Sequence, residues 1–330
     1  MITPPRPPDF LDRYPGLAEL GRTATRLHPR PASGTASPAA TQSHIGGPLA
    51  WPVDEPWPVC ETPRLGREDV PLPPDLVERL RTVQRDPVRP HVSTDAQTQL
   101  MRDIASFVGR GYAGHGSMNG HRYGPIPHPE PYPMVPLAQL RAADVPDLPR
   151  PGGADLLQVL WCPHHHAARP NGPTVALRWR GEVPAGPYAK APAPGSKDPG
   201  YLPEPCRLHP EQVTDYPFHQ ELPKALRKVA RGKYSRLAMA PGWKVGGHAD
   251  WGVTDLGDTS CLSCSGPTRL LLQIDSYEYH SDTARWWRPA GDPDPGNAMT
   301  PTGVRPGRDG AYRIFVCLSC PDTPFRLDLQ

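Results

Sequence analysis

The sequence carries two matched Cys-x-x-Cys knuckles near its end, Cys261-Leu262-Ser263-Cys264 and Cys317-Leu318-Ser319-Cys320. Each knuckle adjoins an apolar run typical of a β-strand, residues 269–275 after the first and residues 312–316 before the second. If these runs pair, both knuckles reach the same edge of a sheet, and four thiolates can surround one Zn²⁺ ion. Four sulfur ligands leave no open coordination position, so the pattern predicts a zinc that supports folding and not a reaction. The alternative is a pair of structural or reducible dithiols.

The composition favours a folded protein with many loops. The chain has 330 residues, including 49 Pro and 31 Gly, with only 7% aromatic residues and a mean hydropathy of -0.55. Proline is excluded from helix interiors and central strands, so this content predicts short regular elements joined by Pro-rich loops. A net charge of +2 creates no global field that would attract nucleic acid or a membrane surface.

The cysteine content indicates a reducing compartment. Seven cysteines, an odd number, occur without a signal-peptide pattern, because residues 1–10 are proline-rich and lack a continuous apolar run. No segment reaches the length of a membrane span. We therefore expect a cytoplasmic protein without a membrane partner, in which paired knuckles bind metal more often than they form disulfides.

Composition and hydrophobic pattern divide the chain into four parts. The parts are a flexible N-terminal arm at 1–42, a β-rich lobe at 43–182, a Pro-rich linker at 183–206 and a second β-rich lobe at 207–330 that carries the knuckles. Further strands are expected at 134–140, 155–162, 174–180 and 325–329. The first lobe contains a helical insertion over about 61–125, with helices at 74–85 and 94–110 followed by a flexible loop at 111–124.

The two lobes repeat three short patterns in the same order. Gly46-Gly47 with Trp51 corresponds to Gly246-Gly247 with Trp251, residues 137–140 correspond to 271–274, and residues 157–162 correspond to 312–317. An internal duplication explains this order more simply than coincidence. We therefore predict an α+β fold of two related β-rich lobes packed about a pseudo-twofold axis, with short helices and the insertion in the first copy.

The same segments resemble the bacterial YwqG-like family, a domain of unknown function. The resemblance rests on residues 44–48, 55–60, 135–140 and 155–163, and in the second half on residues 245–247 with Trp251, Cys261, Cys264 and residues 271–274. It spans roughly residues 43–330. It implies a duplicated β-rich fold akin to that of the eukaryotic programmed-cell-death-protein relatives, which act as ribosome-assembly chaperones. For this chain the resemblance implies no established catalytic activity and points to protein or peptide binding.

A second cluster of metal-binding residue types follows the strand expected at 155–162. Cys162 is followed by Pro163 and by His164, His165 and His166. A thiolate with neutral imidazoles suits Zn²⁺, and fewer than four protein ligands would leave a catalytic opening. Cys60 and His128 are conceivable further ligands, although neighbouring histidines cannot all face one point. The alternative is a solvated turn after the strand.

Two further features suggest partner binding. A basic amphipathic helix is expected over residues 221–236 and includes Arg227 and Arg231, which could contact RNA or an acidic partner or lie on a solvated face. Trp286 and Trp287 stand between two arginines and could anchor a peptide or pack against a sheet.

The sequence therefore favours a non-catalytic, zinc-containing, protein-binding or chaperone-like module that holds a peptide in a groove or by strand addition. Two alternatives stay open. One is a metal-dependent hydrolase centred on Cys162 and His164–His166, and the other is a ribosome- or RNA-associated factor that uses the basic helix.

Overall fold

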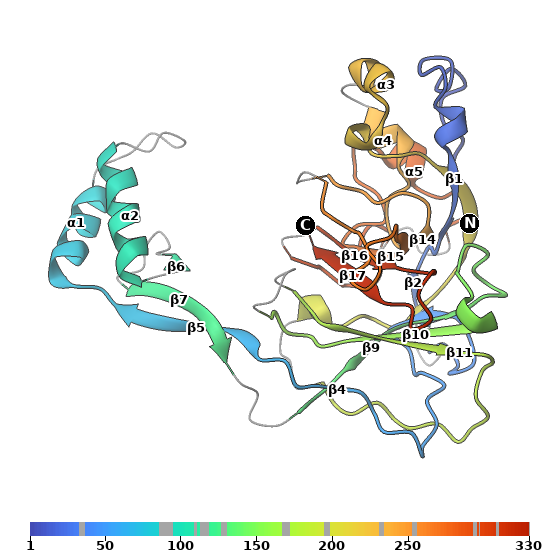
Figure 1. Ribbon diagram of the computed structural model, residues 1–330, viewed down its shortest axis with the longest axis horizontal. Helices are drawn as coiled ribbons and strands as arrows, with labels where there is room; N and C mark the ends of the chain where they lie inside the picture. The colour runs from blue at the N-terminus through green and yellow to red at the C-terminus, as the bar shows by residue number, and fades with distance from the viewer. Residues whose placement is uncertain are drawn as a thin grey trace. The chain divides into compact units, whose positions relative to one another are not determined.

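The computed structural model divides the chain into two compact units (Figure 1). The larger unit comprises Met1–Glu61, Glu130–His164 and Ala168–Gln330, and the smaller unit comprises Thr62–Pro129 and His165–Ala167. The structure describes all residues except 33–36, 86–94, 109–110, 113–118, 127–130, 167–171, 195–198, 231–233, 253–255, 293–295, 297, 308–309 and 330. The fold is mixed and strand-rich, with few helices. No helix in these described ranges is both long and apolar enough to cross a bilayer.

The larger unit contains a six-stranded antiparallel sheet with the order β13-β1-β14-β15-β16-β17. In this order its strands are Glu211–Asp215, Arg22–Arg26, Lys244–Gly246, Arg269–Asp275, Ala311–Val316 and Phe325–Leu329. The strands expected at 269–275, 312–316 and 325–329 are confirmed. They lie side by side as β15, β16 and β17 (Figure 1).

A second six-stranded sheet in the same unit has the order β11-β10-β9-β3-β12-β2. Its strands are Val175–Arg180, Leu156–Trp161, Val135–Arg141, His44–Ile45, Cys206–Arg207 and Arg30–Pro31. The strands expected at 134–140, 155–162 and 174–180 are confirmed as β9, β10 and β11. All pairings in this sheet are antiparallel.

Both sheets contribute to one hydrophobic core. The shared cluster includes Leu137, Leu157 and Trp161 from the second sheet and Leu271, Ile274 and Ile314 from the first. Strand β10 is buried along its whole length, because Leu157, Val159 and Trp161 face this core while Leu160 packs into a cluster on the other face. Since successive side chains of a strand alternate between faces, β10 is buried on both sides, and its one polar side chain, Gln158, donates to the Ala50 carbonyl at 3.1 Å.

The N-terminal segment is built into the larger unit, in contrast to the loosely held arm expected from its composition. Strand β1 lies between β13, which pairs with its whole length, and β14, which pairs with Ala24–Arg26. Phe10 and Leu17 are also buried. Residues 1–42 therefore supply a central strand and part of the core.

The Pro-rich stretch at 183–206 was expected to be a linker, but its last residues are built into the larger unit. Tyr201 is buried in the shared core, where its backbone oxygen accepts a hydrogen bond of 3.0 Å from the indole of Trp161. Cys206 begins β12, which pairs with both β2 and β3. The short strands β2 and β3 therefore share β12 as a partner, although β12 comes from a distant part of the sequence.

The basic stretch at 221–236 forms two short helices where one long helix was expected. They are α3, Lys224–Val229, and α4, Tyr234–Ala238. Ala230 ends α3 with a non-helical ψ of 68°. Further short helices of the larger unit are α5 at Ala284–Trp287 and the 3₁₀ helices η1 at Ala18–Leu20, η2 at Pro151–Gly153, η3 at Pro199–Tyr201 and η4 at His219–Glu221.

The smaller unit combines two helices with a three-stranded sheet of order β5-β7-β6 (Figure 1). The bounds are Pro74–Arg85 for α1, Asp95–Val108 for α2, Arg64–Pro71 for β5, Gly111–Tyr112 for β6 and Asn119–Ile126 for β7. Leu76, Leu80, Leu100 and Ile104 form the buried contact between the helices. Both helices match the expectation. The segment expected as a loop at 111–124 contains β6 and the start of β7 instead, because β7 pairs with β5 and β6 pairs with β7.

A buried histidine makes the stability of the larger unit depend on pH. His44 is fully buried, and burial lowers its pKa to about 4, although its Nε2 hydrogen bond to the Pro48 carbonyl opposes this shift. The unfolded chain binds a proton near the usual histidine pKa of about 6.5 while the folded chain stays neutral, so stability falls as the pH drops from about 6.5 towards 4.

We expect His44→Gln to reduce this pH dependence. From pH 7 to pH 5, the wild type should lose about 2 kcal/mol more of its unfolding free energy than the variant. Urea unfolding of both proteins at the two pH values measures the difference. Equal pH dependence in the two proteins would contradict a neutral, buried His44.

Candidate metal centre and ligand pocket

The two cysteine knuckles meet at one end of the first sheet. The first knuckle precedes β15 and the second follows β16, and these strands pair with Arg269 opposite Val316. This register places Cys261, Cys264, Cys317 and Cys320 together, with all four Sγ atoms within 4.8 Å of one another. The four cysteines could therefore hold a metal ion.

The sulfur spacing fits a tetrahedral ion. The Sγ atoms of Cys261 and Cys320 are 3.9 Å apart, and those of Cys264 and Cys317 are 3.7 Å apart. Four sulfurs at a Zn–S distance of about 2.3 Å lie about 3.8 Å apart at the corners of a tetrahedron. A disulfide would need about 2.05 Å, so the spacing matches a shared ion and not two bridges.

The backbone of the first knuckle is folded around its sulfur atoms. The Ser263 amide lies 3.4 Å from the Cys261 Sγ, and the Ser265 amide donates to the Cys261 carbonyl at 2.9 Å. Ser265 adopts a positive φ of 56° to close this turn. A Cβ on Gly266 would lie 3.2 Å from the Cys264 Sγ, so any other residue would crowd this sulfur.

The thiols of the cluster differ in acidity. A hydrogen bond from the Cys264 amide lowers the pKa of Cys261 to about 6. The neighbouring thiols raise the pKa of Cys320 to about 12, with Cys264 as the largest cause. A thiolate forms readily at Cys261, whereas Cys320 resists a second negative charge, and a bound cation would remove that resistance.

The second cysteine group contains a buried pair of thiols. Cys60 belongs to a two-stranded sheet of β4, Val59–Cys60, and β8, Tyr132–Pro133, and Cys162 follows β10. Both side chains are buried, and Cys60 also lies 3.3 Å from the Thr174 hydroxyl. The hydrogen bond with Cys60 and the burial raise the pKa of Cys162, so its thiol is held in the protonated form.

The histidines proposed as ligands with this pair make different contacts. His164 packs its ring against Tyr132 with a centroid distance of 4.5 Å. His165 and His166 belong to the smaller unit, where His166 Nδ1 hydrogen-bonds to the Pro63 carbonyl at 3.0 Å. His128 lies outside the residues that the structure describes.

The residues proposed for partner binding are only partly brought together. Trp287 is buried, and its indole donates to the Arg236 carbonyl at 2.7 Å. Trp286 is half-buried and stacks with Arg285, whose guanidinium carbon lies 4.3 Å from the ring centroid. Arg227 is exposed, and Arg231 lies outside the described residues.

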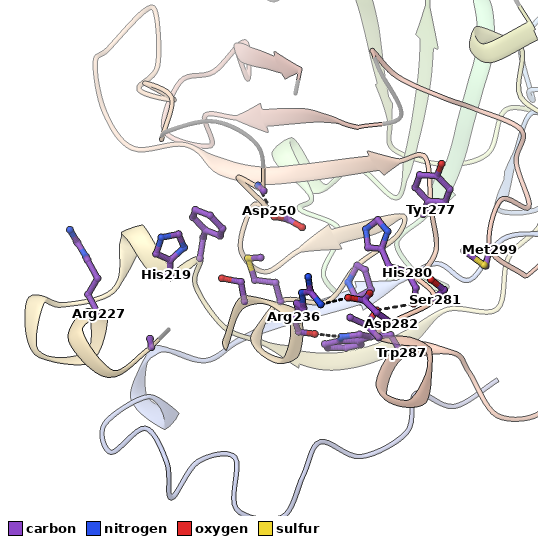
Figure 2. A pocket seen from close by; sticks show the side chains of 17 residues that line it. His219, Arg227, Arg236, Asp250, Tyr277, His280, Ser281, Asp282, Trp287 and Met299 are labelled. Atoms are coloured by element: carbon purple, nitrogen blue, oxygen red, sulfur yellow. Dashed lines mark hydrogen bonds and ion pairs between the residues drawn. The ribbon is translucent and has the colours of Figure 1, made fainter. Parts of the chain in front are cut away.

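Arg227 and Trp287 line the same pocket, which has a volume of about 1090 Å³. Its apolar lining includes Phe218, Met239, Trp287 and Met299, and its titratable lining includes His219, Arg227, Arg236, Asp250, His280 and Asp282. Figure 2 shows Arg236 in contact with Asp282 next to Trp287, while Arg227 and His219 lie together at the left of the view. The pocket thus combines apolar surface with a charged rim.

Most of these lining residues could not be found from the sequence. They come from η4, α3, α4, the segment after β14 and the region of α5, which are separated by up to about eighty positions. His219, Arg236, His280 and Asp282 carry no local motif. Two local signals pointed to the pocket: the basic pattern at 221–236 identified Arg227, and the tryptophan pair beside arginines identified Trp287.

The search for relatives supplies no further information on function. Comparisons of the chain with protein-family models, with curated proteins and with solved structures find no match. The resemblance to the YwqG-like family therefore stays a prediction.

Proposed function

We propose that this chain is a non-catalytic, zinc-stabilised module that binds a protein or peptide partner in the cytoplasm. The observation that carries the proposal is the pocket of about 1090 Å³, whose lining combines Trp287 and other apolar side chains with Arg227 and Arg236. Tryptophan and arginine are enriched at the energetic centres of interfaces, and a mixed apolar and charged concavity suits a peptide side chain with its backbone. The family resemblance points in the same direction.

Zinc is the metal we assign to the four cysteines. Four thiolates in a tetrahedron suit zinc or an iron site, and zinc is the usual occupant of paired Cys-x-x-Cys knuckles. Cys261, Cys264, Cys317 and Cys320 would complete its coordination and leave no position for water, so the ion would stabilise the end of the first sheet.

An internal duplication accounts for the two sheets. The order β12-β3-β9-β10-β11 in one sheet corresponds to β1-β14-β15-β16-β17 in the other. Gln139 pairs with His44 and accepts the Ala50 amide at 2.9 Å, while Gln273 pairs with Lys244 and accepts the Asp250 amide at 3.2 Å. These equivalent hydrogen bonds support two copies of one structural unit.

Equivalent tryptophans add to this support. Trp51 and Trp251 follow those two amides directly, and each lies beneath a guanidinium, that of Arg180 at 4.9 Å and that of Arg313 at 4.8 Å from the ring centroid.

Catalysis at Cys162 is not part of the proposal, because its raised pKa disfavours nucleophilic attack by the thiol. The basic surface that includes Arg227 would also serve an RNA-associated role, and nuclease treatment separates that role from protein binding.

The proposal is tested by selecting peptides on the nuclease-treated wild-type protein and measuring their affinity for variants. We expect Arg227→Glu to lower the affinity for the selected peptides about tenfold, because it reverses an exposed charge on the pocket rim. Arg102→Glu, an exposed reversal on α2, is the matched control and should leave the affinity unchanged. Failure to select any peptide, or equal affinity for both variants, would contradict the proposal.

A further inference from the structure

The segment Ile2-Thr3-Pro4-Pro5-Arg6-Pro7-Pro8 lies on the larger unit in the way that a bound peptide lies on a receptor. Ile2 forms an antiparallel bridge with Ala290, with backbone hydrogen bonds of 3.1 and 2.8 Å in the two directions. Ile2, Pro5 and Pro8 are exposed, so one side of the segment faces solvent. Flanking prolines favour an extended, preorganised backbone, as in ligands of aromatic-lined grooves.

A carboxylate holds the start of this segment. The Thr3 amide donates to both carboxylate oxygens of Glu211 at 2.9 and 2.7 Å, and the Thr3 hydroxyl donates to one of them at 2.6 Å. Arg26 donates to the Thr3 hydroxyl oxygen at 2.9 Å. These contacts fix the register of the segment, because they engage its backbone and not only its side chains.

Arg6 is the side chain that enters the surface. Its Nε donates to the Leu237 carbonyl at 2.6 Å, and its Nη2 donates to the Ala238 carbonyl at 2.9 Å. These are the last two residues of α4, where helix carbonyls lack partners within the helix. A cation that binds there also complements the negative end of the helix dipole.

Aromatic rings surround the same guanidinium. Its carbon atom lies 4.9 Å from the ring centroid of Trp287, 5.1 Å from that of Tyr216 and 5.7 Å from that of Phe10. Planar stacking together with two donors aimed at two carbonyls suits arginine and not lysine, whose ammonium is compact and strongly hydrated.

We propose that this surface, which we call the arginine site and which consists of Glu211, Tyr216, the Leu237 and Ala238 carbonyls, Trp287 and Ala290, recognises an arginine flanked by prolines in a partner protein. Residues 2–8 occupy the site in cis and compete with that partner. The inference rests on the proposed peptide-binding function and names the ligand chemistry for a site that shares Trp287 with the pocket.

The test uses the full chain with the segment released and a fluorescent peptide of residues 1–8. Thr3→Pro with Arg6→Ala removes the amide that binds Glu211 and the guanidinium that enters the arginine site. Fluorescence anisotropy should show that the peptide binds this double variant at least about tenfold more tightly than it binds the wild type, since cis competition is lost. Lysine in place of arginine in the peptide should weaken binding about tenfold.

Two further variants locate the interaction. Tyr216→Leu in the released chain should weaken binding of the peptide, because it removes one aromatic face. Arg227→Glu should leave the binding unchanged, because Arg227 lines the pocket but not the arginine site. No binding to a folded released chain, or equal binding of the lysine peptide, would overturn the inference. The proposed function would still stand if peptides selected on the wild type lose affinity with Arg227→Glu.

The inference stays testable if the double variant does not fold. Arg6→Lys keeps the charge and the backbone contacts in the full chain while it weakens the occupant in cis. It should bind the arginine peptide more tightly than the wild type does, and equal binding would overturn the inference.

Discussion

Lys244→Met is expected to lower the free energy of unfolding by about 3–5 kcal/mol, because it leaves a buried carboxylate without its cation. Lys244 and Asp215 are both fully buried, and the Lys244 Nζ lies 2.8 Å from an Asp215 carboxylate oxygen. The same carboxylate accepts the Ala240 amide at 2.7 Å and the His248 amide at 2.8 Å. It therefore ties β13 and β14, the neighbours of β1, to the loops that follow β14 and α4.

Urea unfolding at pH 7 measures this effect. Lys190→Met removes an exposed lysine and should change the unfolding free energy by less than about 0.5 kcal/mol. Adding Asp215→Asn to Lys244→Met should recover part of the loss, because the orphaned charge is removed. A loss below about 1 kcal/mol for Lys244→Met would show that the pair is not buried as described.

Cys317→Ser is expected to remove the metal and to destabilise the larger unit by several kcal/mol, on the order of the losses seen when a structural site is broken. Cys317 is fully buried at the end of β16, and a hydroxyl is a poor substitute for a thiolate ligand of zinc. Thermal unfolding of the metal-loaded wild type and of the variant measures the loss of stability. Cys206→Ser is the control, since Cys206 is equally buried in β12 but lies outside the cluster, and this variant should keep the metal.

A chelator provides the complementary measurement. It should bring the wild type close to the stability of Cys317→Ser and should change that variant little. If chelation and Cys317→Ser both left stability unchanged, the cysteines would not hold a structural ion.

The central strands could be predicted because their signal is local. Residues 156–161 and 270–274 are apolar runs interrupted only by Gln158 and Gln273, and such runs in a loop-rich chain predict buried strands. The cysteine cluster was predictable for a related reason, since each knuckle directly adjoins one of two strands that pair. Its four sulfur positions follow from the register of β15 with β16.

Strand β1 could not be predicted, because its burial depends on partners far away in the sequence. Thr25 and Arg26 are polar residues with no exposed surface. Arg26 donates to the carbonyl oxygens of Trp287 and Glu278, each at 3.0 Å, and burial lowers its pKa to about 10. The sequence pattern predicts that such residues are solvated, because only the tertiary structure supplies the hydrogen-bond acceptors that make their burial possible.

The pocket and the arginine site could not be predicted either, because their residues come from distant parts of the sequence. Proline and arginine in residues 2–8 indicate an extended, solvated segment when the sequence is considered alone. Its receptor surface is assembled from β13, α4 and the chain around α5. The single helix expected at 221–236 would not have placed the Leu237 and Ala238 carbonyls at a helix end beside Trp287.

Metal content per chain, measured on untagged wild type and on Cys317→Ser, tests the central structural claim most directly. We expect one zinc per wild-type chain and none in the variant, since Cys261, Cys264 and Cys320 would lack the fourth ligand. Wild-type protein without metal, purified under reducing conditions, would contradict the claim that the knuckles share an ion. A zinc that survives in Cys317→Ser would contradict its placement and direct attention to Cys60 and Cys162.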